Sequence, residues 1–255
     1  SIKVNKEKHT ISGRLLEVDF YPCFNSGREI PEREPKNQRT KEQQTLYNQK
    51  TATKKLVRLV NANFDTGDIY LHATYSPENA PQTSDKAYRD VYNYIRRIRY
   101  YRKKHKLPEL RVVAIFEEKT YKTGKYAGLV NIHVHMFMND DGFTRDRAED
   151  FWKFGWVNAR RYNPDVFGPE TAAKYVSKDP KGKKRWYCSQ NLKKPVEREK
   201  KGKISNRYIE RLAKRKDDRT FWENKYKGYA YERVDARFNE YNQKWYVTAI
   251  MFKRS

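Results

Sequence analysis

The sequence has few cysteines and no long apolar run. Cys23 and Cys188 are its two cysteines, and their separation fits neither a zinc motif nor a disulfide framework. A reducing compartment is therefore expected, and the first residues lack an apolar signal core, so we predict a cytoplasmic protein. No stretch approaches the about eighteen apolar residues of a membrane-spanning helix, so we expect no membrane partner.

Acidic residues are also in short supply. Asp and Glu number 32 against 56 Lys and Arg, which gives a formal net charge of +24. A charge this far from zero stores self-repulsion, and its usual counterpart is a polyanion whose condensed counterions are released on binding. Aromatic residues make up 15% of the chain, which argues against disorder and offers surfaces on which unpaired bases can stack. Nucleic acid is therefore the expected partner.

Hydrophobic periodicity predicts an α+β fold, with a mainly antiparallel sheet flanked by helices. Helical spacing of apolar residues predicts helices over residues 40–64, 84–104 (with Ser84 as the cap), 144–152, 168–180 and 204–215. Alternation of apolar and polar residues predicts strands over residues 14–22, 68–75, 109–117, 131–138, 229–238 and 244–252. The polar segments 1–13 and 190–203 are expected to be irregular.

The same pattern suggests three segments along the chain. Residues 1–66 would supply a strand, a loop and a helix that pack on a central domain. Residues 67–185 would form that domain. Residues 186–255 would add a basic helical segment and a β-hairpin that could grip DNA or complete the core.

Two of only five histidines lie together in the run "NIHVHMFMN", residues 131–139. Alternate side chains of a strand leave the same face, so His133 and His135 would point the same way, roughly 6.6 Å apart along the strand. Two imidazoles at this separation can converge on one cation. A lone histidine in such a strand would be interpreted as structural, but two on one face favour a metal site.

A third ligand is expected from a neighbouring strand. Glu117 ends the preceding strand and could place its carboxylate beside the two histidines. A bulge there would present Glu118 instead. His72 is a further candidate. Imidazole and carboxylate ligands that face a phosphate substrate suit Mn²⁺ or Mg²⁺, and zinc is also compatible.

A second motif lies downstream, in "ETAAKYVSK". Tyr175 and Lys178 are three residues apart, so they would share one face of a helix. Ala172, Ala173 and Val176 form an adjacent apolar stripe that would dock the helix and hold Tyr175 at the edge of the buried face. Taken alone, this pattern is typical of core packing, and its interest comes from its pairing with the histidine strand.

Together the two motifs resemble the HUH endonuclease superfamily. The elements that match are His133-Val134-His135, then Tyr175-Val176-Ser177-Lys178, with the strand "DIYLHATY" ahead of both. Order and separations agree across residues 68–180, and the chain looks most like rolling-circle replication initiators (Rep proteins) of bacterial plasmids, phages and integrated elements. The resemblance implies the HUH/Rep nuclease fold, a relative of the ferredoxin-like fold. Only one tyrosine occupies the helix position, so the chain looks like a single-tyrosine enzyme.

The resemblance also implies a mechanism. Tyr175 would attack a phosphodiester of single-stranded or hairpin origin DNA, leaving a 5′-phosphotyrosine link and a free 3′-OH that can prime synthesis. A phenol is a poor nucleophile at neutral pH because its ordinary pKa is about 10. A divalent cation, Mn²⁺ or Mg²⁺, held by His133, His135 and Glu117 would stabilise the transition state. Lys178 would add positive charge near the tyrosine or the phosphate.

Basic residues near these motifs are candidates for DNA contact. They are Arg96 and Arg99 on the helix 84–104, then Lys174, Lys181, Lys183, Lys184 and Arg185. The nucleotide loop G-x-x-x-x-G-K-[ST] is missing, so unwinding would need a partner. From the resemblance we expect a host helicase and a DNA polymerase as partners.

Two alternatives stay open. The first keeps the chemistry but changes the biology to a relaxase or a single-tyrosine transposase, although relaxases commonly place the tyrosine ahead of the histidines. The second is a non-catalytic, basic nucleic-acid-binding protein, in which the histidines and Tyr175 would be structural.

Overall fold

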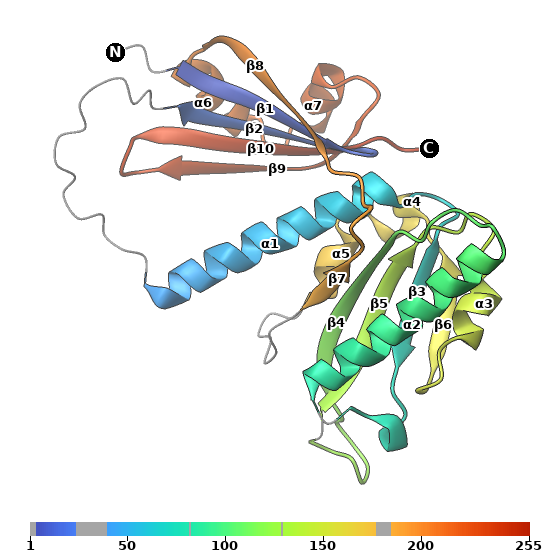
Figure 1. The fold of residues 1–255 in the computed structure, drawn as a ribbon. Coiled ribbons are helices and arrows are strands. Elements are labelled where there is room, and N and C mark those ends of the chain that lie inside the picture. Colours follow the sequence, from blue (N-terminus) through green and yellow to red (C-terminus); the bar gives the residue numbers. More distant parts are fainter. Residues whose placement is uncertain (1–3, 24–39, 82, 129, 177–184) are drawn as a thin grey trace, which may run out of the picture. The chain divides into compact units, whose positions relative to one another are not determined.

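The computed structural model describes residues 4–23, 40–81, 83–128, 130–176 and 185–255. The chain divides into two compact units, one formed by Ser1–Ala52 with Lys194–Ser255 and the other by Thr53–Lys193. Each unit contains a five-stranded antiparallel sheet with helices packed on it (Figure 1). The predicted α+β class with antiparallel sheets is therefore confirmed. Among the helices described, none combines the length and hydropathy that a membrane crossing requires.

The first unit joins the two ends of the chain in one sheet, in the order β8-β1-β2-β10-β9. Its strands are β1 (Val4–Ser12), β2 (Leu15–Cys23), β8 (Val196–Ile204), β9 (Ala230–Asn239) and β10 (Lys244–Phe252). Two helices, α6 (Asn206–Lys214) and α7 (Arg219–Lys225), cover one face. Leu212 and Trp222 from these helices pack with Val18 and Met251 from the sheet. The predicted C-terminal hairpin is confirmed as β9 and β10.

Two strands of this sheet contradict the prediction of irregular segments. β1 lies between β8 and β2, and it buries the polar residues Asn5, Glu7 and Thr10. β8 reads "VEREKKGKI" and forms an edge of the sheet, where Glu199 pairs with Lys6. Neither strand alternates apolar and polar residues, because β1 buries polar side chains and β8 carries mostly charged ones. Periodicity therefore gave no signal for either strand.

The second unit holds the sequence motifs. Its sheet has the order β6-β3-β5-β4-β7. Its strands are β3 (Ile69–Thr74), β4 (Val112–Thr120), β5 (Val130–Met138), β6 (Val157–Arg161) and β7 (Trp186–Cys188). Its helices are the second part of α1 (Lys41–Asn63), a 3-10 turn (Pro77–Asn79), α2 (Ser84–Lys104), α3 (Arg145–Asp150), α4 (Pro164–Phe167) and α5 (Thr171–Lys174). The short strands β6 and β7 were not predicted.

One face of this sheet is apolar and packs against α2, which crosses it (Figure 1). Val91 and Ile95 of α2 join Leu71 and Val134 of the central strands in one core. The helix begins as predicted, but its cap is Thr83 rather than Ser84, because the Thr83 side chain accepts a hydrogen bond from the Lys86 amide. Because side chains alternate along a strand, the residues between these core positions place their side chains on the opposite face of the sheet.

The predicted helix over residues 168–180 is shorter than expected. Gly168, with φ of 87°, ends α4, and α5 begins at Thr171 and ends at Lys174. Tyr175 is the C-cap residue of α5, with φ of −98° and ψ of −4°. Residues 177–184, and with them the predicted Lys178, lie outside the described residues.

Candidate metal and nucleophile site

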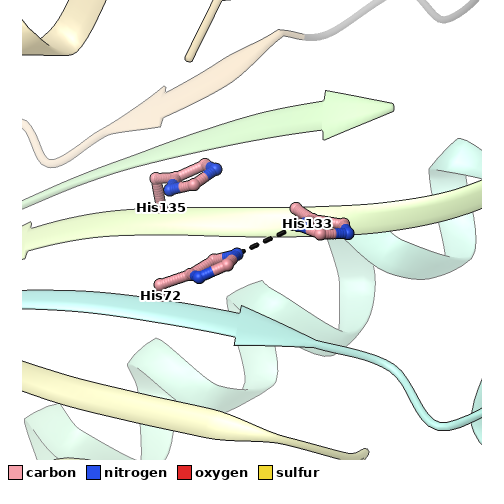
Figure 2. Close-up of side chains that lie close together, drawn as sticks. All are labelled: His72, His133 and His135. Atoms are coloured by element: carbon pink, nitrogen blue, oxygen red, sulfur yellow. Dashed lines mark hydrogen bonds between the residues drawn. The ribbon is translucent and has the colours of Figure 1, made fainter. Parts of the chain in front are cut away.

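Three histidines meet on the face of the second sheet opposite α2. β3 pairs with β5 so that His72 lies opposite His135 and Thr74 lies opposite His133. One ligand atom from each of the three histidines lies within 4.8 Å of the other two. Figure 2 shows the rings on the two adjacent strands, with Nε2 of His72 at 3.0 Å from Nδ1 of His133. The structure therefore places His72, the further candidate for a third ligand, beside the predicted pair His133 and His135.

Glu117 lies on the same face as the histidines. The β4–β5 register is regular over its full length, with Glu117 opposite His133 and Glu118 opposite Ile132. Because side chains alternate, Glu118 points to the other face of the sheet. The Oε2 atom of Glu117 lies 2.9 Å from Nε2 of His135, and Lys119 Nζ lies 3.1 Å from the same oxygen. Both Glu117 and His72 are thus placed to complete a ligand set, whereas Glu118 is not.

The three histidines are uncharged at neutral pH. Burial lowers the pKa of His133 and of His135 to about 4, in each case against the opposing charge of Glu117. Burial also lowers the pKa of His72, with further contributions from the positive charges of Lys119 and Arg160. Metal ligation requires neutral imidazole. The three rings are therefore in the protonation state that a cation needs.

A hydrogen-bonded chain fixes the tautomer of His135. Burial opposes ionisation of Glu117, but hydrogen bonds from His135 and Lys119 outweigh it and lower its pKa. The ionised carboxylate can only accept, so Nε2 of His135 carries the proton. Nδ1 then accepts from the Tyr70 hydroxyl at 2.8 Å, whose pKa burial holds above its ordinary value. Nε2 could ligate a cation if this proton moved to Nδ1, where the ring would donate to the Tyr70 oxygen.

These side chains fit a divalent cation. Three neutral imidazoles lie on the face of the sheet, and one ionised carboxylate, that of Glu117, contacts His135. Imidazole suits transition metals, and carboxylate also suits Mn²⁺ and Mg²⁺. The addition of His72 makes the set richer in nitrogen than predicted. It therefore fits Mn²⁺ or zinc better than Mg²⁺.

The predicted nucleophile stands next to the histidines. The ring of Tyr175 stacks on that of His135, with 3.9 Å between centroids and 13° between planes. Tyr175 is half-buried, and Ala172 of the same helix is buried as the apolar stripe predicted. The loop before α5 is tied to α1, because Asn61 Nδ2 donates to the Pro169 carbonyl at 2.6 Å. Tyr175 is thus held against the cluster and remains reachable.

The rings form a row with an exposed end. His135 stacks in turn on His72, with 4.5 Å between centroids and 5° between planes. Trp156 presents itself to His72 at 5.3 Å and 76°, in an edge-to-face contact. Sequence reasoning missed both Trp156 and Tyr70. Tyr70 could have been predicted, because the alternation in strand 68–75 places it on the same face as His72. Trp156 could not, because the sequence pattern did not predict the strand β6 that follows it.

Two of the predicted DNA-binding residues, Arg96 and Arg99, line different pockets in the part of the chain that the structure describes. Arg96 lines an open pocket of about 630 Å³ on α2 with Arg97, Tyr100, Lys104 and Arg147, and none of the described residues that line it is acidic. Arg99 instead donates to the Tyr187 hydroxyl at 3.1 Å and lines a separate pocket. Lys174 is exposed, and Arg185 is half-buried. Lys181, Lys183 and Lys184 lie outside the described residues.

Comparison with known proteins gives no family assignment. No protein-family model, no curated protein and no solved structure matches the chain. What can be said of function therefore depends on the residues and their geometry.

Proposed function

We propose that this chain nicks and rejoins single-stranded DNA through a phosphotyrosine intermediate, as a replication initiator does at an origin. The observation that carries the proposal is the contact between Tyr175 and His135, which joins the two sequence motifs in one site. The chain between the motifs folds back so that phenol and imidazoles share one face of a sheet. A structural role for each motif alone would not require this proximity.

Each side chain has a distinct role in this proposal. His72, His133 and His135, with Glu117, would hold a divalent cation. When bound, that cation polarises the scissile phosphate and offsets charge that develops in the transition state. Lys119 and Arg160 contribute positive charge at His72 and would attract the phosphate backbone. Tyr70 orients the His135 ring through the hydrogen bond at Nδ1.

The proposed reaction is a transesterification. The Tyr175 phenolic oxygen forms a bond to phosphorus and loses its proton to water, while the bond from phosphorus to the 3′ oxygen breaks. The 3′ oxygen takes up a proton and leaves as a free hydroxyl. The phosphotyrosine ester keeps the phosphodiester bond energy, so attack by a 3′-OH rejoins the strand without ATP.

The test is covalent capture on synthetic DNA. Single-stranded oligonucleotides are incubated with the protein and Mn²⁺, and adducts are detected as a shifted band on a denaturing gel. Tyr175→Phe should abolish the adduct while DNA binding persists. Tyr241→Phe, at a tyrosine that is 98% exposed in the first unit, is the matched control and should react normally. An adduct formed by the Tyr175→Phe variant would overturn the assignment of the nucleophile.

The biological setting belongs to the same proposal. A cytoplasmic initiator would require a host helicase and a DNA polymerase, and origin DNA would be single-stranded or extruded as a hairpin. A relaxase or a single-tyrosine transposase would form the same adduct and differ in the sequence that it nicks. If no oligonucleotide yields an adduct but binding is salt-dependent, the protein is a basic DNA-binding protein instead.

A further inference from the structure

Trp156 is a large aromatic side chain exposed at the edge of the histidine cluster. It is 56% exposed, whereas Trp152, four residues earlier in the chain, is 4% exposed. Its ring contacts that of His72 at 5.3 Å and 76°. An indole left in water beside a polar site forgoes the burial that favours tryptophan in a core.

This exposure is built into the backbone. The Thr74 amide donates to the Trp156 carbonyl at 2.8 Å, and the Ser76 amide donates to the Phe154 carbonyl at 2.8 Å. Between them, Gly155 packs so closely that a Cβ there would lie 2.3 Å from the Ser76 nitrogen. Only glycine permits this approach. The segment that carries Trp156 is therefore fixed by backbone contacts to the end of β3, two residues after His72. These contacts hold the backbone of Trp156 in a position where the indole is exposed beside His72.

The surroundings of Trp156 fit a nucleotide. Lys119 and Arg160 place positive charge near His72, offset in part by the Glu117 carboxylate, so a phosphate at the histidines that Trp156 adjoins would meet more positive than negative charge. A base attached to that phosphate, or to the next one along the strand, would lie within reach of the Trp156 ring, which contacts His72. Stacking on aromatic rings is the usual way in which proteins hold unpaired bases without reading their sequence.

We propose that Trp156 forms a binding site for an unpaired nucleobase next to the scissile phosphate. This inference rests on the proposed function for the identity of the substrate. It assigns the preference for single-stranded DNA to a specific residue, because a base inside a duplex cannot present its face to the indole.

The experiment measures binding without chemistry. The Tyr175→Phe protein, in EDTA, is titrated with a thymidine oligonucleotide of about twelve residues and with an abasic spacer of the same length and charge. The parent should prefer the thymidine oligonucleotide. Adding Trp156→Ala should weaken binding of thymidine about five- to hundredfold and leave binding of the abasic spacer unchanged. Trp156→Phe should retain most of the affinity.

Tyr241→Ala is the matched control, because it removes an exposed aromatic ring from the first unit. It should bind as the parent does. If the parent binds both oligonucleotides equally, or if Trp156→Ala lowers affinity for both by the same factor, the inference is wrong. Because no bond is cleaved in this assay, its outcome is independent of whether Tyr175 proves to be the nucleophile.

Discussion

The phenol of Tyr175 lies face to face with the imidazole of His135, at 3.9 Å between ring centroids. His135 in turn accepts a hydrogen bond from Tyr70 and donates one to Glu117, so its ring has little freedom to rotate. The position of the Tyr175 ring is therefore constrained by its packing on His135, which is itself held on the strand β5. A nucleophile positioned by a rigid sheet avoids the entropic loss of ordering a mobile side chain during attack.

Removal of single ligands should reveal which residues hold the cation. His72→Asn and His135→Asn should each weaken Mn²⁺ binding at least about tenfold, as measured by isothermal titration calorimetry. EDTA should abolish adduct formation, and Mn²⁺ should restore it more effectively than Mg²⁺ because the ligand set is rich in imidazole.

Glu117 and Glu118 form a matched pair for the same experiment. Glu117→Gln should weaken Mn²⁺ binding, because the Glu117 carboxylate lies on the face of the histidines and would itself be a ligand. Glu118→Gln should not, because Glu118 faces the other side of the sheet. Equal effects of the two changes would show that the carboxylate acts only through its charge, and that the three histidines alone are the ligands.

The Cys188 thiol should be unreactive near neutral pH. Burial raises the pKa of Cys188 to about 11, and the thiolate is the form that alkylating reagents attack. In a Cys23→Ser protein, the alkylation rate with iodoacetamide should rise about tenfold per pH unit between pH 7 and 10. The same protein unfolded in urea should react faster, with a rate that levels off near the ordinary thiol pKa. A folded protein whose rate levels off near pH 9 would contradict the shift.

The site was predictable to the extent that it depends on local periodicity. His133 and His135 share a face because a strand alternates, and the Tyr175 helix was visible from its apolar stripe. His72 was harder to assign, because its place depends on the register between β3 and β5, whose paired histidines are 63 positions apart. That register depends on how the two strands pack against α2, and the sequence of either strand alone does not predict this packing.

The first unit shows a second limit of periodicity. β2 pairs with β10, so Asp19 lies beside Thr248 although 229 positions separate them. β1 buries Asn5, whose amide donates to the Ile204 carbonyl at 2.7 Å, and buried polar residues look like loop residues in the sequence. Long-range pairing and satisfied polar burial are thus the features that sequence reasoning missed, whereas the amphipathic helices α2 and α6 were found.

Gly155 should be intolerant of any side chain. Gly155→Ala would push the new Cβ against the backbone of Ser76 and Thr74, and overpacking of this kind costs about 1–3 kcal/mol. Gly124→Ala is a useful control, because Gly124 has a φ of 78° but nothing lies within 4 Å of its Cβ position. Gly155→Ala should lower the free energy of unfolding in urea at least as much as Gly124→Ala. It should also weaken single-stranded DNA binding, which the control should not.

The pocket on α2 should contribute to DNA affinity through charge. Arg96 and Lys104 line this pocket, whereas Arg89 and Lys103 are exposed on the same helix without lining it. The double change Arg96→Ala with Lys104→Ala should reduce the slope of log affinity against log salt by about 1.4 for single-stranded DNA, because each lost phosphate contact removes about 0.7. Arg89→Ala with Lys103→Ala removes the same charge and should change the slope less. Equal losses for the two pairs would mean that DNA responds to the total charge of +24 and not to the pocket.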